Sequence, residues 1–303
     1  MRFALALGLT LYCLLGTAHA QDRTDSHLET DLSDTALAQE LANPIANLTS
    51  VPFQNNFDFG GGRGNAFRYT LNVQPVIPFT LNDDWNLITR TIVPFAHVER
   101  VFPQPETGIS DIVQSFFLSP ARPVNGITWG AGPIFLYPSA SNDFIGSGQW
   151  GAGPTGVVLK QSGGWLYGIL ANHLWAVGGV PHLPSGTLPL LEVPNSGIAD
   201  PGFVKTTPGN RRRERVNATL IQPFLTYTFP TQTTPFLSTE TIYDWSSRQS
   251  IVPISVGVNQ LVFIGGQLLQ VGGLMRYFAE TPRGGPNWGF QFRVTLVFPH
   301  GSY

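Results

Sequence analysis

The residues that could carry out chemistry do not assemble into a recognisable cofactor site. Residues 151–156, Gly-Ala-Gly-Pro-Thr-Gly, fit the spacing of a dinucleotide-binding loop. However, the segment before them is itself rich in glycine, Pro154 interrupts the pattern, and no helix is predicted to follow. We interpret these glycines as positions of close backbone packing in a β-sheet wall. The sequence therefore predicts no nucleotide site and no cofactor.

The histidines do not show the spacing of a metal site, because no two are four positions apart and none belongs to an acidic cluster. Those beyond the N-terminal segment are His27, His97, His173, His182 and His300. The single cysteine, Cys13, lies near the N-terminus, so no disulfide and no cysteine-bound metal are expected. No Gly-x-Ser-x-Gly motif is present. We predict that the protein is not an enzyme and keep an outer-membrane hydrolase as a minor alternative, since triad residues need not be close in sequence.

The first twenty residues have the features of a cleaved export signal. Arg2 supplies a positive charge, an apolar run extends from Phe3 to Leu15, and Ala18-His19-Ala20 forms a small-x-small cleavage site. The apolar run is too short for a membrane anchor, and no later stretch reaches the roughly 18 apolar residues of a spanning helix. We expect cleavage after Ala20 and no helical membrane protein.

The composition is unusual for a protein surrounded by water. Charged residues make up only 12% of the chain, about half the usual share in soluble domains. The net charge of −2 becomes slightly more negative when Arg2 is removed, which argues against a nucleic-acid partner. So little charge indicates that much of the surface faces lipid, or that the protein is an unusually apolar β protein.

Beyond residue 50 the chain divides into β segments of about ten residues, separated by clusters of Gly, Pro, Asn and Asp. Their count of about twelve is even, as in bacterial single-chain barrels. The predicted strands are Val51 to Phe59, Gly64 to Phe79, Asp84 to Val98, Ile109 to Leu118, Gly126 to Tyr137, Gly148 to Lys160, Trp165 to Val177, Arg215 to Phe229, Pro235 to Trp245, Ile251 to Phe263, Gln267 to Phe278 and Asn287 to Phe298.

The last of these segments alternates most clearly. One face carries Trp288, Phe290, Phe292, Val294, Leu296 and Phe298, whereas the other carries Gly289, Gln291, Arg293 and Thr295. At about 3.3 Å per residue and a tilt of about 40°, the segment rises roughly 25 Å, the height of the apolar band of an outer-membrane barrel. Short connections alternate with mostly longer ones, as expected for periplasmic turns and outer loops.

A soluble β-sandwich or jelly roll is the alternative fold, because it also shows alternation and turns. Prolines inside the predicted strands suit neither fold easily, and we expect β-bulges at them. They are Pro75, Pro94, Pro133, Pro154, Pro223 and Pro253. We predict an all-β transmembrane barrel with three regions: a signal peptide (1–20), a polar segment with a short helix (21–50) and the barrel (51–303).

The helix is predicted from the spacing of Leu37, Leu41, Ile45 and Leu48 within Ser33 to Leu48. We expect it to bend or end near Pro44. Two interpretations are open: a plug or constriction inside the lumen, and a periplasmic cap, which we favour.

Polar residues on the predicted inner face are the candidate lumen lining, either as a wetted pathway or as ion pairs and hydrogen bonds that fill a narrow barrel. For any single residue the filling role is favoured. The candidates are Arg68, Asn72, Gln74, Arg90, Asn172, Glu240, Asn259, Gln270, Arg276, Gln291 and Arg293. Arg211, Arg212, Arg213 and Arg215 end the longest loop, where they would contact lipopolysaccharide phosphates or form a solvated basic loop.

Several segments together resemble the outer-membrane family named for the meta-cleavage pathway of phenol degradation. The likeness spans about Asn43 to Pro299 and is carried by NPIANLTSVPFQNNFDFG (43–60), GISDIVQSFFLSP (108–120), GSGQWGAGPTGVVL (146–159), NHLWAVGG (172–179), IQPFLTYTFP (221–230), Asp244-Trp245 and WGFQFRVTLVFP (288–299). The resemblance implies a single barrel and a role in uptake, with no catalytic residues or cofactor. The chain departs from the family in the loop from Gly178 to Glu214 and in the tail from His300 to Tyr303.

These observations predict an outer-membrane channel for passive passage of small molecules. The expectation of aromatic or apolar solutes comes from the family name, and passive diffusion is expected because no energising domain is recognised. The alternative is a barrel with a closed lumen that serves as a structural or surface-binding protein. The expected partners are outer-membrane lipid, lipopolysaccharide and a small-molecule solute; no oligomeric state is predicted.

Overall fold

The structure is a computed structural model that describes residues 34–61, 65–100, 104–179, 215–282 and 285–298. The predicted signal peptide, most of the polar segment after it, and Arg211 to Arg213 lie outside these described residues. No helix in the described part of the chain is long and apolar enough to span a membrane.

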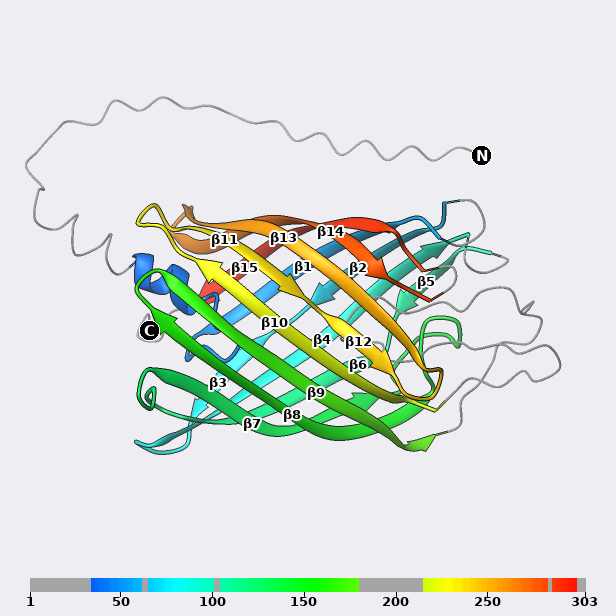
Figure 1. Cartoon of the computed structure of the whole chain (residues 1–303), viewed down its shortest axis with the longest axis horizontal. Coiled ribbons are helices and arrows are strands. Elements are labelled where there is room, and N and C mark those ends of the chain that lie inside the picture. Colours follow the sequence, from blue (N-terminus) through cyan, green and yellow to red (C-terminus); the bar gives the residue numbers. More distant parts are fainter. Residues whose placement is uncertain (1–33, 62–64, 101–103, 180–214, 283–284, 299–303) are drawn as a thin grey trace, which may run out of the picture.

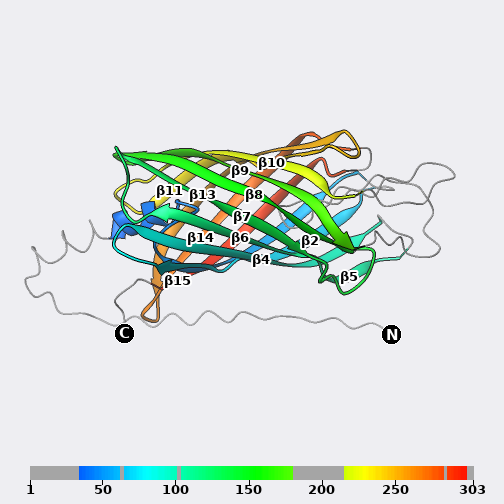
Figure 2. The ribbon, with the colours of Figure 1, turned by 90° about the horizontal axis from the view of Figure 1, so that it is seen from below.

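The chain forms a closed antiparallel β-barrel of twelve strands (Figures 1 and 2). Each strand pairs with its neighbours in sequence, and the last strand pairs with the first from Thr49↔Phe298 to Phe59↔Trp288, which closes the barrel. Three of the twelve strands are each interrupted and form two labelled pieces: β2 with β3, β5 with β6, and β11 with β12. The labelled strands are β1 (Thr49–Phe59), β2 (Phe67–Val73), β3 (Val76–Thr80), β4 (Trp85–Glu99), β5 (Glu106–Ile109), β6 (Ile112–Pro120), β7 (Ile127–Tyr137), β8 (Gln149–Ser162), β9 (Trp165–Gly179), β10 (Asn217–Tyr227), β11 (Thr233–Thr239), β12 (Thr241–Asp244), β13 (Gln249–Ile264), β14 (Gln267–Glu280) and β15 (Trp288–Phe298).

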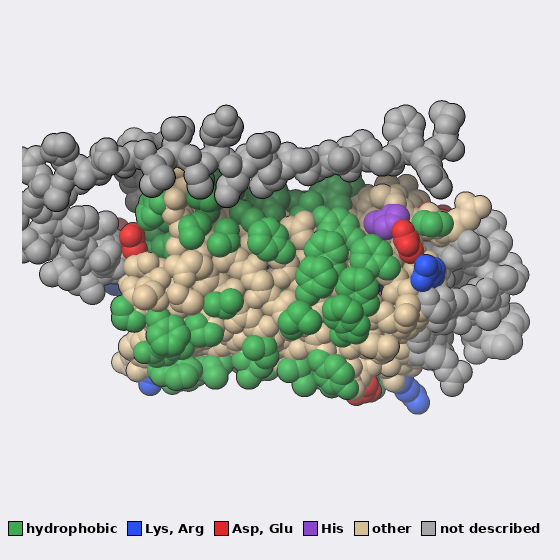
Figure 3. Space-filling view, turned by 90° about the horizontal axis from the view of Figure 1, so that it is seen from above, with side chains coloured by type: hydrophobic (Ala, Val, Ile, Leu, Met, Phe, Trp, Pro, Cys, Tyr) green, Lys and Arg blue, Asp and Glu red, His purple; other side chains and the backbone are tan. Residues whose placement is uncertain are grey.

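The predicted barrel fold is therefore confirmed, and each predicted strand lies on an observed one. The outer wall is apolar: exposed large hydrophobic side chains project from strands all round the barrel, and Figure 3 shows them spread over one face between its two ends. In β15 the two predicted faces are observed, because Phe292 is 51% exposed whereas Gln291 is 6% exposed.

The prolines interrupt the strands in two ways. Pro75 lies in the break between β2 and β3, and Pro253 lies at a shift in register between β13 and β14, so these two fit the expected irregularities. Pro133 and Pro154 instead face each other inside the β7–β8 ladder. The pairing of β6 with β7 and of β8 with β9 is interrupted beside these two residues, because neither proline has an N–H to donate.

The N-terminal helix covers residues 34–40 and lies in one end of the barrel (Figure 1). It ends at residue 40, close to the end expected near Pro44, whose ring disfavours a helical conformation at Asn43. Turns follow instead, with the Asn43 side chain accepting a hydrogen bond from the Ile45 backbone. Short turns lie at this end, including the two-residue connections at 163–164 and 265–266, in which Gly163, Gly265 and Gly266 have positive φ.

The connection between β7 and β8, residues 138–148, folds inward at the opposite end. Ile145 and Ser147 are each 1% exposed, although both belong to a loop. Asp111, which is fully buried, accepts hydrogen bonds from the backbone N and the Oγ of Ser147, both at 2.5 Å, and from the backbone N of Ala140 at 3.2 Å. Asp111 thus holds the loop inside this end of the barrel, together with hydrogen bonds that join Ile109 and Ile112 to Ser141 and Ser139.

Candidate functional site

The inner wall of the barrel has a polar side and an apolar side. The polar side is formed by the adjacent strands β13, β14, β15, β1 and β2, whose buried inward residues include Asn259, Arg276, Gln291, Asn56 and Arg68. β4 to β10 form the more apolar side: besides inward polar residues such as Asn86, Ser115 and Asn172, they carry many buried apolar residues. These are Ile88, Ile92, Val113, Phe117, Ile134, Leu136, Val157, Leu159, Leu166, Leu170, Leu174, Ala218 and Leu220.

One hydrogen-bonded chain on the polar side connects β14, β1 and β15. Arg276 forms an ion pair with Asp58 at 3.3 Å and donates a hydrogen bond to Asn56 Oδ1 at 3.1 Å. Gln291 Nε2 donates to the same Asn56 oxygen at 2.7 Å, and Arg293 donates to Gln291 Oε1 at 3.0 Å. The charge of Arg276 is therefore balanced by Asp58, whereas the one hydrogen-bond partner of the Arg293 side chain in the described part of the chain is a neutral amide.

A second chain connects β4 to β1. Arg90 donates to Gln74 Oε1 at 2.9 Å, and Gln74 Nε2 donates to Gln54 Oε1 at 2.8 Å. Across from these residues, Glu240 accepts a hydrogen bond from Gln222 at 3.3 Å. Arg293 interacts electrostatically with Glu240 and Arg90, so these charged groups belong to one site.

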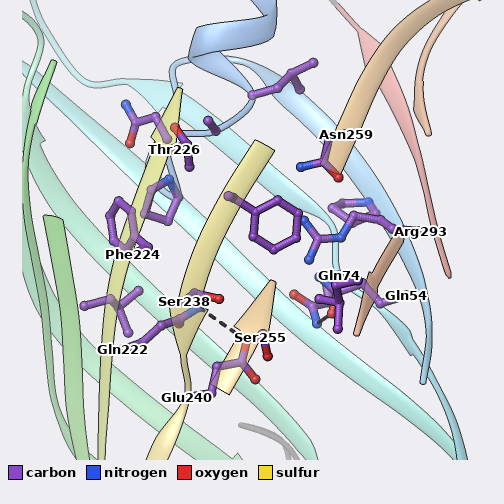
Figure 4. A pocket seen from close by; sticks show the side chains of 18 of the residues that line it. Gln54, Gln74, Gln222, Phe224, Thr226, Ser238, Glu240, Ser255, Asn259 and Arg293 are labelled. Atoms are coloured by element: carbon purple, nitrogen blue, oxygen red, sulfur yellow. Dashed lines mark hydrogen bonds between the residues drawn. The ribbon is translucent and has the colours of Figure 1, made fainter. Parts of the chain in front are cut away.

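A cavity of about 160 Å³ lies between the polar and apolar sides. In Figure 4, Arg293, Gln74 and Gln54 project from one side of it and Phe224 from the other, while Gln222 and Glu240 are joined by a hydrogen bond. Phe236, Leu170 and Leu274 add apolar surface to the lining. The site is therefore amphipathic.

Three buried polar atoms that lack hydrogen-bond partners belong to residues that line this cavity. They are Arg293 Nε, which is a donor, Gln222 Oε1, which is an acceptor, and Thr226 Oγ1. An unsatisfied buried polar group costs free energy, on the order of 1–3 kcal/mol.

The N-terminal segment closes the cavity at the helix end of the barrel. Leu41, Ala42, Asn43, Pro44 and Ala46 line the cavity. Ile45 is 3% exposed and packs in a cluster with residues of the inner wall. The segment therefore enters the lumen, as in the plug interpretation, and does not lie only across its mouth as a cap would.

Contacts with two turns hold the helix in place. Gln39 donates to the backbone oxygen of Gly163 at 2.8 Å and accepts from Gln161 at 2.7 Å, while Thr35 donates to the backbone oxygen of Pro230 at 3.3 Å. Glu40 accepts a hydrogen bond from the Asn47 backbone at 2.9 Å. Burial raises the pKa of the Glu40 carboxyl above its ordinary value of 4.5, and the Asn47 hydrogen bond lowers it by less.

Most of the candidate lumen residues are brought together in the cavity. Seven line it: Gln74, Arg90, Glu240, Asn259, Arg276, Gln291 and Arg293. Arg68 and Gln270 are also buried, at 9% and 4% exposure, but do not line it. The same holds for Asn72 and Asn172, each 8% exposed.

Sequence reasoning missed two groups of lining residues. Gln54 on β1 was detectable, since it begins the polar alternation Gln54, Asn56, Asp58. Phe224, Phe236 and Leu170 carried no usable signal, because an apolar residue facing the lumen resembles one facing lipid when both faces of a strand are apolar. In the described residues no group of three or more His, Cys, Asp or Glu is placed to hold a metal ion.

A closed twelve-stranded barrel with an apolar outer wall is the architecture of an outer-membrane β-barrel protein, and the chain belongs to this class. Its fold is similar to that of an outer membrane channel from Pseudomonas putida F1, with a TM-score of 0.60, 13% identity, and coverage of 84% of this chain and 97% of that one. An outer membrane phospholipase from Salmonella typhi, crystallised as a dimer with bound calcium, matches with a TM-score of 0.42, 10% identity and coverage of 87% and 97%. No protein-family model and no curated protein matches the chain.

Proposed function

We propose that the protein is a passive channel that carries small apolar or aromatic solutes across the outer membrane. The observation that supports this proposal most directly is the amphipathic cavity inside the barrel, with Phe224 opposite Arg293 and unsatisfied polar atoms in its lining. Its 160 Å³ is close to the volume of an engineered apolar cavity of about 150 Å³ that binds benzene. A solute with one ring therefore fits.

The apolar side of the inner wall provides a second line of support. Ile92, Val113 and Leu136 continue the apolar surface toward the end of the barrel opposite the helix, which suits an apolar solute better than an ion or a sugar. The proposal also agrees with the resemblance to the phenol-pathway family, whose supposed role is uptake. Membership of that family, the lack of enzymatic activity and contact of Arg215 with lipopolysaccharide are further parts of this proposal.

The second candidate is a closed barrel that serves as a structural or surface-binding protein. It is favoured by the two segments inside the lumen, residues 41–48 at one end and 138–148 at the other. In the channel these two segments leave a path for solute through the lumen, whereas in the closed barrel they block it.

Conductance of the refolded mature protein in a planar bilayer, repeated with residues 22–49 deleted, tests the proposal. We expect small steps from the intact chain and larger steps from the deletion. Silence in both proteins, with folding verified by heat-dependent migration in gels, would contradict the channel and favour the closed barrel. A closed barrel would also conduct equally little after Arg276→Ala or Arg293→Ala.

A further inference from the structure

We propose that the lumen cavity is a binding site for a small carboxylate, with Arg90 and Arg293 recognising the anion and the apolar side of the cavity holding its hydrocarbon part. This inference rests on the proposed channel function and names the class of solute. It depends on the charges around the cavity, on spare hydrogen-bond donors, and on the arrangement of polar and apolar lining.

The charges lining the cavity do not balance. Arg276 is matched by Asp58. Among the residues that the structure describes, neither Arg90 nor Arg293 forms an ion pair. Among the described residues of the lining, Glu240 is the one carboxylate, and a single carboxylate cannot neutralise two guanidinium groups. One positive charge of the described lining is therefore left for an anion from outside the protein.

The two arginines also have unused donors. A guanidinium carries five N–H donors, whereas Arg90 and Arg293 each make one side-chain hydrogen bond, to Gln74 and Gln291 respectively. Arg293 Nε also lacks a partner, but it is shielded from the cavity, so the terminal N–H groups are the donors that a ligand would use. A carboxylate accepts two parallel hydrogen bonds from a guanidinium, which matches this unused donor geometry better than a single-oxygen ligand such as an alcohol.

The rest of the lining suits the remainder of such a molecule. Phe224 and Leu170 lie on the side of the cavity formed by β9 and β10, and Phe236 on β11 adds a second ring. A polar head at Arg293 directs the apolar part of the solute toward Phe224 (Figure 4). The volume admits one ring or a short chain, so benzoate is a suitable probe.

Binding of 4-fluorobenzoate and of the uncharged, nearly isosteric 4-fluorobenzamide to the refolded mature protein, followed by fluorine NMR, tests this inference. We expect the carboxylate to bind at least tenfold more tightly than the amide, a difference of about 1.4 kcal/mol. Arg293→Gln and Arg90→Gln should each reduce this preference to less than about threefold. Arg248→Gln, at an exposed turn, is the matched control and should preserve it.

If an arginine variant fails to fold, Glu240→Gln tests the same site, because it should strengthen the binding of benzoate where the arginine variants weaken it. It removes the carboxylate that competes for the arginines, so benzoate should bind at least about threefold more tightly. Equal affinity for the two probes, or a preference unchanged by Arg293→Gln, would overturn the inference. Conductance measured in the same preparation separates the two proposals. Conductance without a preference for benzoate contradicts only the carboxylate site. A preference for benzoate without conductance contradicts only the channel.

Discussion

Arg276 and Asp58 illustrate how single residues stabilise the polar side of the lumen. Their side chains are 10% and 1% exposed, and removing one partner leaves the other charge buried. Breaking a buried ion pair costs about 3–5 kcal/mol. We therefore expect Asp58→Ala to lower the free energy of unfolding by roughly 3 kcal/mol, measured by urea titration of the protein in lipid vesicles.

The comparison is the exposed contact of His97 with Glu99, which is an ion pair only while His97 is protonated; the two atoms are 3.1 Å apart and the side chains are 33% and 43% exposed. Glu99→Gln should change the free energy of unfolding by less than about 1 kcal/mol. If the two substitutions have equal effects, burial is not what makes the Arg276–Asp58 pair important.

For single residues, the sequence predicts which polar side chains face the lumen better than it predicts which apolar side chains do. A polar side chain such as Gln291, between Phe290 and Phe292, identifies its own face because only the lumen accommodates it. Phe224 gives no such information, because both lipid and this lumen accept a phenyl ring. The hydrogen-bond partners within the polar chains also depend on register between strands, which alternation in one strand does not determine.

The N-terminal helix is an element whose position should depend on pH through Glu40. Because burial raises the pKa of this carboxyl in the docked segment, docking favours the protonated form. Docking is therefore strongest below pH 4.5, the ordinary pKa, and weakens as the pH rises through the raised pKa. We therefore expect the open probability of the channel in a planar bilayer to increase as the pH rises from 4.5 through the raised pKa of Glu40.

The matched variant is Glu40→Gln, which keeps a side-chain oxygen for the Asn47 backbone N–H but does not titrate. Its open probability should be constant over the range in which the wild-type protein changes. An identical pH dependence in both proteins would assign the effect to another group.

The inward loop, residues 138–148, depends on Asp111 for its position. This carboxylate accepts hydrogen bonds from Ser147 and Ala140. Asp111→Ala would leave those donors unsatisfied and release the loop toward the outer surface. We expect faster cleavage by chymotrypsin at Phe144 in intact cells and larger conductance steps. Unchanged cleavage would show that packing of Ile145 and the hydrogen bonds of Ser139 and Ser141 hold the loop without Asp111.

Among the elements, strands were more predictable than the segments inside the barrel. A strand in contact with lipid repeats its apolar pattern over ten residues, so its limits are visible, as in Trp288–Phe298. The loop at 138–148 has no such repeat, and its inward fold depends on the distant residue Asp111. The helix ended at residue 40 because the local effect of Pro44 outweighed the leucine spacing.

The molecule as a whole divides the lumen lengthwise into polar and apolar sides. The division follows the order of strands round the barrel, with β13 to β2 the more polar side and β4 to β10 the more apolar one, although Leu274 on β14 and Asn172 on β9 show that each side holds residues of both kinds. An amphipathic solute could keep its polar group on one side and its hydrocarbon part on the other along the lumen. This arrangement links the proposed channel to the proposed carboxylate site.

The outer surface of the barrel gives a prediction that depends on membrane depth. Phe292 lies near the middle of β15, is 51% exposed, and projects from the apolar wall. Ile264, 61% exposed, ends β13 beside the short turn at the helix end. An arginine on the lipid face costs about 2–4 kcal/mol at the bilayer midplane and about 0–1 kcal/mol near the interface. Phe292→Arg should therefore lower the free energy of unfolding in vesicles by about 2–4 kcal/mol, and Ile264→Arg by less than about 1 kcal/mol. An equal loss of unfolding free energy in the two variants would contradict the placement of the apolar wall across the bilayer. That placement puts Phe292 near the midplane and Ile264 near the interface.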